Sequence, residues 1–296
     1  MKNKALVIFN PTAGVIIKSD VKKIVEDKLF NLGYIAIFLI LDSYFEEEID
    51  QLNISNISLV LAVGGDGTVK VATREIIKRK INAPLLIVPF GSANVFANAL
   101  GLPIDFRKAL DLLDGFKTVK VDVGRLDKKH YFLVGFALGY VSEVVINTEL
   151  SLKNKFGSWG YLIKLFWHKV RIPRIKFKIE TEKGRFWIKG NSLIVLNVFK
   201  FYGFQPKKEI SPFDGILNLY LVTNKTFWAM FEAAFGVLFY TKPPRHIFML
   251  DNKKFKIRVR GKRFLKTAQI DGDSIKINRN FEIEILPSIL EVINNN

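Results

Sequence analysis

Short apolar runs alternate with segments of helical periodicity through about the first 120 residues. Ala5–Phe9 is apolar throughout, as expected of a strand buried on both faces of a parallel sheet. The pattern predicts a doubly wound α/β domain, in which ligands bind at the carboxyl ends of the strands. The further strands expected here are Ile35–Leu41, Leu59–Val63 and Leu85–Val88, with helices over Val21–Leu29, over about Val69–Arg79 and from Val95 onward.

After about residue 120 the apolar positions follow a period of two. Apolar and polar residues alternate through Arg174–Gly190 on both sides of Lys183-Gly184, which predicts a β-hairpin. Other candidates are strands at Ser192–Phe199, Ile216–Thr223, Lys254–Arg260, Thr267–Ile270 and Phe281–Leu286, and helices near Gly160–Arg171 and Thr226–Tyr240. We therefore predict an α/β domain over residues 1–120 and a mostly antiparallel β-sandwich over 121–286. The segment 287–296 is a candidate to pack back onto the first domain.

Composition narrows the chemistry that the chain can perform. Its 296 residues are 49% hydrophobic and 25% charged, which excludes global disorder. The absence of Cys excludes disulfides, Cys-ligated zinc and a thiol nucleophile. The three His residues lie far apart in sequence and argue against a His-built metal centre. Carboxylates, hydroxyls, amides and the main chain are left to carry any reaction.

Basic residues concentrate in the second part of the chain. Residues 1–125 hold 16 Lys and Arg against 14 Asp and Glu, whereas residues 126–296 hold 29 against 14. The resulting net charges of +2 and +15 indicate that the second part lies near something negative, such as a phosphorylated ligand, a nucleic acid or an anionic membrane. No nucleic-acid-binding motif accompanies the charge, so we expect no nucleic acid partner.

Several segments favour contact with a membrane surface. In Lys254–Arg260 four cations alternate with three apolar residues, although a solvated outer face is the simpler interpretation. Aromatic residues beside cations near Trp159–Arg174 and Phe227–Arg245 suit a bilayer interface, but packing into the core explains them as well. The longest apolar run, Phe227–Tyr240, is shorter than the roughly 20 residues needed to span a bilayer. With no targeting segment evident, we expect a cytoplasmic protein with peripheral membrane association.

Three glycine-containing loops follow strands of the predicted α/β domain. They are Asn10–Gly14, Gly64–Thr68 and Pro89–Asn94. Glycines allow main-chain N–H groups to approach phosphate oxygens, and a following helix N-terminus adds donors and partial positive charge. Thr68, Ser92 and Asn94 could donate further hydrogen bonds. Any one such loop is explained equally well by a tight strand-to-helix turn, but three at one sheet edge favour a phosphate site.

The presence of Asp66 in a predicted phosphate-binding loop requires a chemical explanation, because its charge repels phosphate unless the carboxylate contacts Mg²⁺ or a hydroxyl. The standard fingerprints G-x-G-x-x-G and G-x-x-x-x-G-K-[ST] are absent, which argues against a Rossmann dinucleotide site and a Walker loop.

The loop sequences resemble a known family. Asn10-Pro11-x-x-Gly14, Gly64-Gly65-Asp66-Gly67-Thr68 and Pro89-x-Gly91-Ser92-x-Asn94 are similar to signatures of the diacylglycerol kinase catalytic-domain family, which includes bacterial lipid kinases and sphingosine kinases and is related to NAD kinases. The similarity continues, in the family's order, through Asp122-Val123-Gly124, Asp214-Gly215 and Asp271-Gly272-Asp273.

The resemblance implies that ATP binds between the α/β domain and the β-sandwich, and that its γ-phosphate passes to a lipid hydroxyl, with diacylglycerol the default acceptor. It implies that ATP contacts Asn10, Gly64, Gly65, Asp66, Gly67, Thr68, Val69, Lys70, Gly91, Ser92 and Asn94. It also implies that Asp66 and Asp122 support Mg²⁺, and that Asp214 with the carbonyls of Ser211 and Ile216 holds a second Mg²⁺. Asp273 stands where the family usually has the Glu general base, and with Asp271 and Asp66 it completes the catalytic set.

Three positions depart from the family pattern. Lys70-Val71 replaces a common Asn-Glu, Val95 replaces an Asp, and Asp273 shortens the base by one methylene. These departures keep open a catalytically impaired lipid- or nucleotide-binding relative. A kinase of a sphingoid base or of NAD also stays open, although the chain has no Asn-Glu dipeptide of the kind that NAD kinases carry. A homodimer is a further partner left open.

Overall fold

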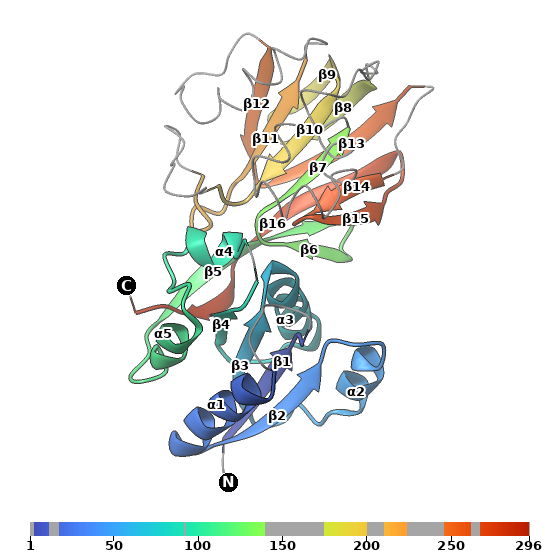
Figure 1. Cartoon of the computed structure of the whole chain (residues 1–296). Helices are drawn as coiled ribbons and strands as arrows, with labels where there is room; N and C mark the ends of the chain where they lie inside the picture. Colours follow the sequence, from blue (N-terminus) through green and yellow to red (C-terminus); the bar gives the residue numbers. More distant parts are fainter. Residues whose placement is uncertain are drawn as a thin grey trace, which may run out of the picture. The chain divides into compact units, whose positions relative to one another are not determined.

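The chain divides into two compact units, and it crosses from one unit to the other twice. The computed structural model describes residues 3–11, 18–91, 93–139, 175–199, 210–223, 246–261 and 267–295. The first unit comprises Met1–Asp122 and Pro287–Asn296, and the second comprises Val123–Leu286. The chain passes between them within β5 (Thr118–Leu126) and again within β16 (Asn280–Ile293) (Figure 1). The helices predicted near Gly160–Arg171 and Thr226–Tyr240 lie outside the described residues.

A parallel sheet forms the centre of the first unit. Its strand order is β2-β1-β3-β4, and the C-terminal part of β16 continues it, with Val292 paired to Leu85. The strands are almost wholly apolar because helices cover both faces. Their bounds are β1 Asn3–Phe9, β2 Tyr34–Ile40, β3 Ile57–Gly64 and β4 Leu85–Pro89.

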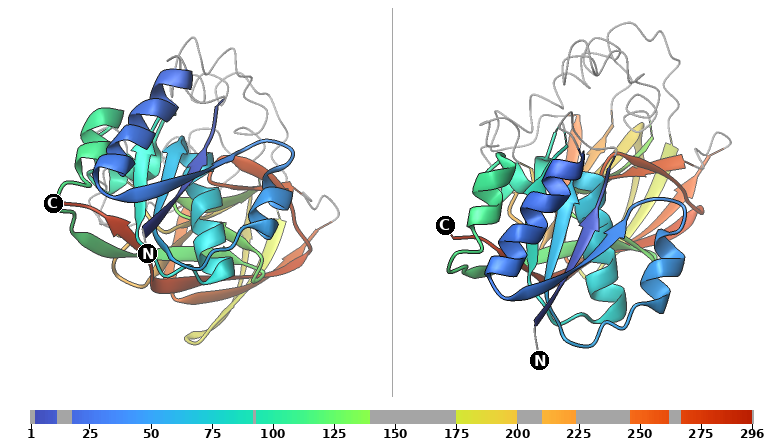
Figure 2. Two further views of the ribbon diagram at one scale, coloured as in Figure 1. Left: turned by 90° about the horizontal axis from the view of Figure 1, so that it is seen from below. Right: turned by 60° about the horizontal axis from the view of Figure 1, so that its bottom comes forward.

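Helices lie on both sides of this sheet, as Figure 2 shows for the first unit. Val21, Val25 and Leu29 of α1 share one hydrophobic cluster with Leu110 of α5, and this cluster covers one face. Ion pairs join α2 to α3 on the other face. The helices are α1 Lys18–Asn31, α2 Phe45–Gln51, α3 Asp66–Arg79, α4 Val95–Ala99 and α5 Phe106–Asp111.

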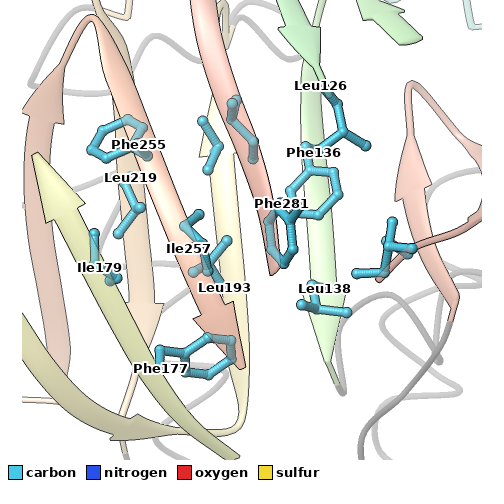
Figure 3. Close-up of a cluster of buried hydrophobic side chains, with 14 of the residues drawn as sticks. Leu126, Phe136, Leu138, Phe177, Ile179, Leu193, Leu219, Phe255, Ile257 and Phe281 are labelled. Atoms are coloured by element: carbon cyan, nitrogen blue, oxygen red, sulfur yellow. The ribbon is translucent and has the colours of Figure 1, made fainter. Parts of the chain in front are cut away.

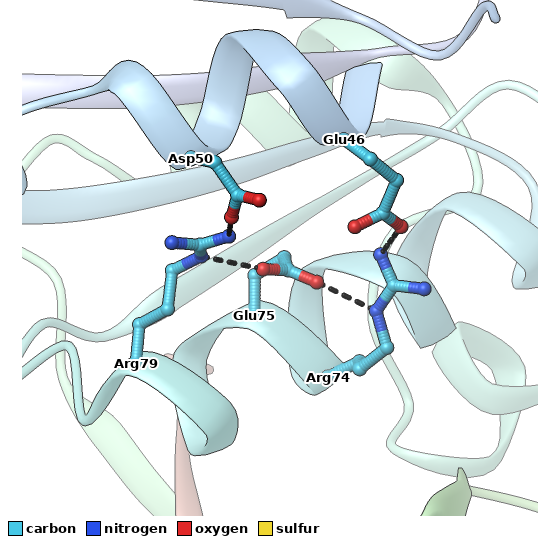
Figure 4. A network of polar contacts seen from close by, with 5 residues as sticks. All are labelled: Glu46, Asp50, Arg74, Glu75 and Arg79. Carbon is cyan, nitrogen blue, oxygen red and sulfur yellow. Dashed lines mark hydrogen bonds and ion pairs between the residues drawn. The ribbon is translucent and has the colours of Figure 1, made fainter. Parts of the chain in front are cut away.

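A buried carboxylate anchors α3, the helix that follows the second glycine-containing loop. Glu75 is fully buried and accepts hydrogen bonds from Nε of Arg74 at 2.6 Å and from Nε of Arg79 at 2.7 Å (Figure 4). The two guanidinium groups in turn pair with Glu46 and Asp50 of α2. The hydrogen bond from Arg79 lowers the pKa of Asp50. Because a buried charge is tolerated only when paired, this network fixes the position of α3 against α2.

The second unit is a sandwich of two mostly antiparallel sheets. One sheet has the order β12-β11-β10-β7-β14-β15, and the other contains the N-terminal part of β16 followed by β13, β8 and β9. β5 pairs with β16 and with β6. The remaining bounds are β6 His130–Phe132, β7 Gly135–Gly139, β8 Ile175–Thr181, β9 Gly184–Gly190, β10 Ser192–Leu196, β11 Leu217–Val222, β12 Ile247–Asn252, β13 Lys254–Arg260, β14 Thr267–Ile270 and β15 Asp273–Lys276.

Side chains from both sheets fill the sandwich core. Phe136 and Phe281 lie with ring centroids 5.5 Å apart, and Phe177, Phe255 and Leu193 are wholly buried in the same cluster (Figure 3). The inward residues occupy every second position along each strand, which is the pattern expected of packed sheets. The predicted fold class, an α/β domain followed by a mostly antiparallel β-sandwich, is confirmed.

Some elements differ from the expectation. Strands β5, β6, β7, β12 and β15 and helices α2 and α5 were not predicted, and α3 begins at Asp66 rather than near Val69. The missed strand β6 has three residues, too few for a periodicity to be recognised. Among the described residues, no helix combines the length and apolar character needed to cross a bilayer.

Candidate functional site

The three predicted phosphate loops begin at one edge of the parallel sheet. Phe9 pairs with Val63 and Gly64 pairs with Pro89, so the carboxyl ends of β1, β3 and β4 are level. The N–H of Asn10 donates to the Val63 carbonyl at 3.0 Å, and the N–H of Phe90 donates to the Gly64 carbonyl at 2.8 Å, which extends this alignment into the loops. The chain changes direction across the sheet between β1 and β3, the position where doubly wound folds bind ligands.

The second and third loops touch through their glycines. A Cβ on Gly91 would lie 2.6 Å from Cα of Gly65, and a Cβ on Gly65 would lie 3.2 Å from Cα of Gly91. Gly64 is equally constrained, because a Cβ there would meet Oγ1 of Thr68 at 2.1 Å. Packing alone therefore requires glycine at positions 64 and 91, and it leaves little room for a side chain at position 65.

Gly67 differs from these glycines because packing does not require it. Among the described residues, a Cβ at this position would meet no atom within 4 Å, and the residue is exposed in the first turn of α3. Glycine destabilises a helix by up to about 1 kcal/mol relative to alanine. The fold alone therefore gives no reason for glycine here, whereas close approach of a ligand to the main chain does.

The start of α3 presents main-chain donors. N–H groups of Thr68 and Val69 donate to the Gly65 carbonyl, and the N-cap residue Gly65 has no side chain with which to cap the helix. Within the described part of the chain, no oxygen accepts a hydrogen bond from the N–H of Asp66 or Gly67. These two amides and the helix dipole make the turn suited to an anion.

Asp66 is directed toward α4, the short helix after the third loop. Its Oδ2 accepts the N–H of Val95 at 3.0 Å and its Oδ1 accepts the N–H of Phe96 at 3.1 Å. Asn94, the N-cap residue of α4, makes no side-chain cap bond, so Asp66 supplies the cap from another loop. Two amide donors on this carboxylate also explain how an acid is tolerated beside a phosphate loop.

Other residues expected to contact ATP have structural contacts of their own. Asn94 is buried, and its side chain closes the third loop by accepting the N–H of Gly91 at 3.1 Å and donating to the Gly91 carbonyl at 2.8 Å. The buried hydroxyl of Thr68 packs over Gly64 and has no hydrogen-bond partner among the described residues. Val69 is buried in α3 and Lys70 is half-buried there. Ser92 lies outside the described residues.

Asp122, expected to support Mg²⁺, is almost fully buried in the first unit. Its Oδ1 accepts the N–H of Ser288 at 2.7 Å, where β16 adopts a positive φ of 52°. Gly124 of the same motif is required by packing, since any Cβ there would overlap the ring of Phe132. Among the described residues, no group of three or more His, Asp or Glu side chains comes together as a metal site.

The segment around Asp214 offers oxygen donors of the kind that Mg²⁺ prefers. Oδ1 of Asp214 accepts the N–H of Ile216 at 2.9 Å, and Gly215 between them has a positive φ of 68°. The carboxylate of Asp214 and the carbonyls of Ser211 and Ile216 are hard ligands that fit Mg²⁺ chemically. A cation here would use one carboxylate, main-chain carbonyls and water.

Asp271 and Gly272 form a tight turn that carries Asp273. Their φ angles of 47° and 89° and the closing pair of Ile270 with Asp273 match a two-residue hairpin with positive φ at both central residues. Asp273 is exposed as the first residue of β15. The Asp271-Gly272 dipeptide is therefore explained in part by the requirements of the turn.

The carboxylate of Asp271 accepts three main-chain N–H groups. They belong to Leu133 at 2.7 Å, Val134 at 2.9 Å and Gly135 at 2.9 Å. With its oxygens engaged in this way, Asp271 is suited to holding the turn in place rather than to accepting a proton. We therefore treat it as a positioning residue for Asp273.

Asp271→Asn tests this positioning role. Asn tolerates positive φ, so the turn itself is kept, but the amide group opposes one of the three N–H donors. We expect the free energy of unfolding to fall by about 1.5–3 kcal/mol, measured by urea denaturation of the full chain. Asp273→Asn is the matched control and should change stability by less than about 0.5 kcal/mol, because that side chain is exposed. Equal stability of both variants would contradict the assignment.

Sequence reasoning missed the main-chain partners of the acids. The N–H groups of Val95 and Phe96, and those of Leu133–Gly135, carry no side-chain signature. A run of donors can be recognised only when the fold brings it to a carboxylate.

Known proteins resemble this chain in sequence. Residues 4–126 match the family model described as diacylglycerol kinase catalytic domain. A diacylglycerol kinase of Staphylococcus epidermidis strain RP62A is 32% identical over 203 residues, which are 66% of this chain and 62% of the relative. A diacylglycerol kinase of Staphylococcus aureus strain MRSA252 is 29% identical over 204 residues, 66% of this chain and 61% of the relative. The matches thus span less than two thirds of the length of these curated relatives.

Solved structures share the fold. A candidate diacylglycerol kinase from Bacillus anthracis str. Sterne has a TM-score of 0.80 at 23% identity, and the match covers 99% of this chain and 97% of that one. A second crystal structure of a diacylglycerol kinase from the same organism gives a TM-score of 0.73 at 20% identity, with the same shares covered. Together with the level loop edge and its glycines, the family match makes residues 4–126 similar to the diacylglycerol kinase catalytic domain.

Proposed function

We propose that this protein is an ATP-dependent lipid kinase that transfers the γ-phosphate of ATP to the hydroxyl of a lipid alcohol. Diacylglycerol is the proposed acceptor and phosphatidic acid the product. ATP and Mg²⁺ are the proposed cofactors, and the protein is proposed to act at the surface of an anionic membrane. The relatives named above are diacylglycerol kinases, which supports the choice of acceptor.

The observation that carries the nucleotide part of this proposal is the exposed Gly67. It stands in a helix where glycine is unfavourable, packing does not require it, and the neighbouring amides have no acceptor among the described residues. Phosphate oxygens of ATP are acceptors of the size and charge that such a turn takes. The carboxylate of Asp66 does not oppose them fully, because it is shared with two N–H donors of α4.

The proposed reaction forms one bond and breaks one. The acceptor oxygen bonds to the γ-phosphorus while the bond from that phosphorus to the β,γ-bridging oxygen breaks and releases ADP. The hydroxyl proton passes to the carboxylate of Asp273, which Asp271 positions through the 133–135 main chain. Bound Mg²⁺ would neutralise charge on the phosphates, with Asp66 and Asp122 as its proposed support and the Asp214 segment as a second proposed site.

Gly67→Ala tests the phosphate site without disturbing the fold. Because the added methyl would meet no atom of the described residues, we expect the free energy of unfolding to stay constant or to rise by up to about 1 kcal/mol. ATP affinity should fall at least about tenfold, the equivalent of one charge-assisted hydrogen bond. Isothermal titration with ATP and Mg²⁺ measures the affinity, and urea denaturation measures the stability.

Gly261→Ala is the matched control for this experiment. It also adds a methyl in open space at an exposed glycine without positive φ, but in the second unit. Its ATP affinity should equal that of the unaltered protein. If Gly67→Ala binds ATP as tightly as the control, the nucleotide does not use this turn.

An acceptor panel tests the reaction itself. ATP consumption is measured with diacylglycerol, a sphingoid base and NAD, and the product is identified by mass. Turnover with diacylglycerol supports the proposal, and turnover with only one of the others reassigns the acceptor. Tight ATP binding without turnover on any of them favours a catalytically impaired relative, which Val95 supports because it leaves α4 without a carboxylate in its first turn.

A further inference from the structure

The outer face of β9, β8 and β13 carries rows of cations. Arg260 pairs with Lys176, which pairs with Lys189, so three cations form one row across the three strands. In the next row, Arg258 pairs with Lys178, which pairs with Trp187. Residues directly opposite in antiparallel strands point to the same face, and the intervening residues of these strands face the sandwich core.

Trp187 stands among these cations with 44% of its surface exposed. Nζ of Lys176 lies 4.7 Å from the ring centroid, Cζ of Arg260 lies 5.0 Å away, and Nζ of Lys178 lies 5.7 Å away. These are cation–π distances, and they hold the cations beside the ring. An exposed aromatic ring at the centre of a cationic face suits a partner that accepts both an amphipathic ring and positive charge.

Charges at the other end of the face are compensated. Lys254 pairs with Glu282 at 2.6 Å and with Glu284 at 3.3 Å, and its hydrogen bond to Glu282 raises its pKa. Glu180 pairs with Lys178, and this hydrogen bond lowers the pKa of Glu180. The cations beside Trp187 differ in their ion pairing.

Within the described residues, no carboxylate forms an ion pair with Lys176, Lys189 or Arg260, and Arg258 meets only the amide oxygen of Asn280 at 2.7 Å. We call Lys176, Trp187, Lys189, Arg258 and Arg260 the Trp187 patch. No acid of the described residues neutralises its four exposed cations, so they can attract an anionic partner.

We propose that the Trp187 patch is the surface by which this protein docks on anionic phospholipid membranes. The patch is specified independently of the candidate catalytic residues, although its biological purpose rests on the proposed lipid kinase function. Trp is the side chain most suited to the bilayer interface, and each cation near an anionic leaflet adds attraction. A second copy of the chain is disfavoured because two such patches repel. Nucleobases are disfavoured because Lys176 and Arg260 already occupy positions over the ring where a base would stack.

Vesicle binding of the full chain tests this proposal. Binding to vesicles of phosphatidylcholine with 30% phosphatidylglycerol, and to phosphatidylcholine alone, is measured by co-sedimentation at about 0.1 M salt. The double variant Lys176→Gln/Arg260→Gln removes two patch cations, and Trp187→Ala removes the aromatic anchor. The control Lys129→Gln/Lys253→Gln removes two exposed cations of the same unit outside the patch.

We expect about thirtyfold weaker binding to the anionic vesicles for Lys176→Gln/Arg260→Gln, and a measurable loss for Trp187→Ala. The control should lose less than about threefold. Equal losses in both double variants would overturn the proposal, since attraction would then follow net charge alone. Patch-dependent binding of a single-stranded oligonucleotide but not of vesicles, or a patch-dependent dimer in sedimentation, would overturn it in favour of another partner.

An activity measurement separates this proposal from the proposed function. Phosphorylation of a short-chain diacylglycerol in neutral detergent micelles requires no anionic surface, so Lys176→Gln/Arg260→Gln should keep its turnover there. Patch-dependent vesicle binding without any kinase activity would leave the docking surface standing and remove the lipid kinase. Kinase activity together with vesicle binding that does not depend on the patch would support the lipid kinase and remove the docking surface.

Discussion

Asp273→Asn should lower turnover on a lipid acceptor by roughly 10²–10⁴-fold while ATP affinity stays unchanged. An amide cannot take the hydroxyl proton, and general base catalysis typically contributes a factor of this size. Asp273 is exposed at the end of a two-residue turn. The measurement is steady-state phosphorylation of diacylglycerol in mixed micelles, with ATP binding followed separately by calorimetry.

Asp273→Glu is the informative partner of this variant. Glu keeps the carboxylate and restores the residue usual in the family at this position, so turnover should be retained within about tenfold. An Asp273→Asn variant with full turnover would remove Asp273 as the base. A loss of ATP affinity that accounts for the whole loss of turnover would assign it to binding instead.

Asp66→Ala should reduce turnover by at least about a hundredfold and lower the free energy of unfolding by about 1.5–3 kcal/mol. The stability loss arises because the N–H groups of Val95 and Phe96 lose a charged acceptor, and α4 has no side-chain cap of its own. The activity loss arises because the Asp66 carboxylate no longer holds the start of α4 against the second loop. Urea denaturation and the micelle assay measure the two effects.

Asp66→Asn distinguishes the cap from support of a metal. Its amide oxygen can still accept one of the two N–H groups, so part of the stability should return. If Asp66 also supports Mg²⁺, the Asn variant should need a higher Mg²⁺ concentration for half-maximal turnover. An unchanged Mg²⁺ requirement would restrict Asp66 to joining the loops, and unchanged stability in Asp66→Ala would contradict the cap.

Much of the fold follows from periodicity along the chain. The all-apolar run Ala5–Phe9 predicted a strand covered on both faces, and β1 is buried there as expected. The alternation in Lys254–Arg260 predicted one apolar and one cationic face, and Phe255, Ile257 and Val259 do pack into the core. It could not reveal that Lys254 is neutralised by β16, because the pairing of strands distant in sequence leaves no local trace.

The candidate site was only partly accessible from sequence. The three loops and their glycines were recognised from their sequence motifs, and the level strand ends bring these loops to one edge of the sheet. The motif treats Gly64, Gly65 and Gly67 alike, yet packing among the described residues requires glycine at the first, crowds the second and leaves the third open. Roles in ATP and metal binding stay predictions.

The sequence by itself determined the two kinds of domain, because the periods of helices and strands are local properties. It also determined which loops have the backbone freedom that glycine provides. Only the tertiary structure decided that Asp66 caps α4, that Asp271 holds the 133–135 main chain, and that Trp187 gathers cations from two other strands. Main-chain donors are identical at every residue, so the sequence cannot tell which of them a distant carboxylate will meet. That choice is made by strand register and helix position, which depend on the packing of the whole unit.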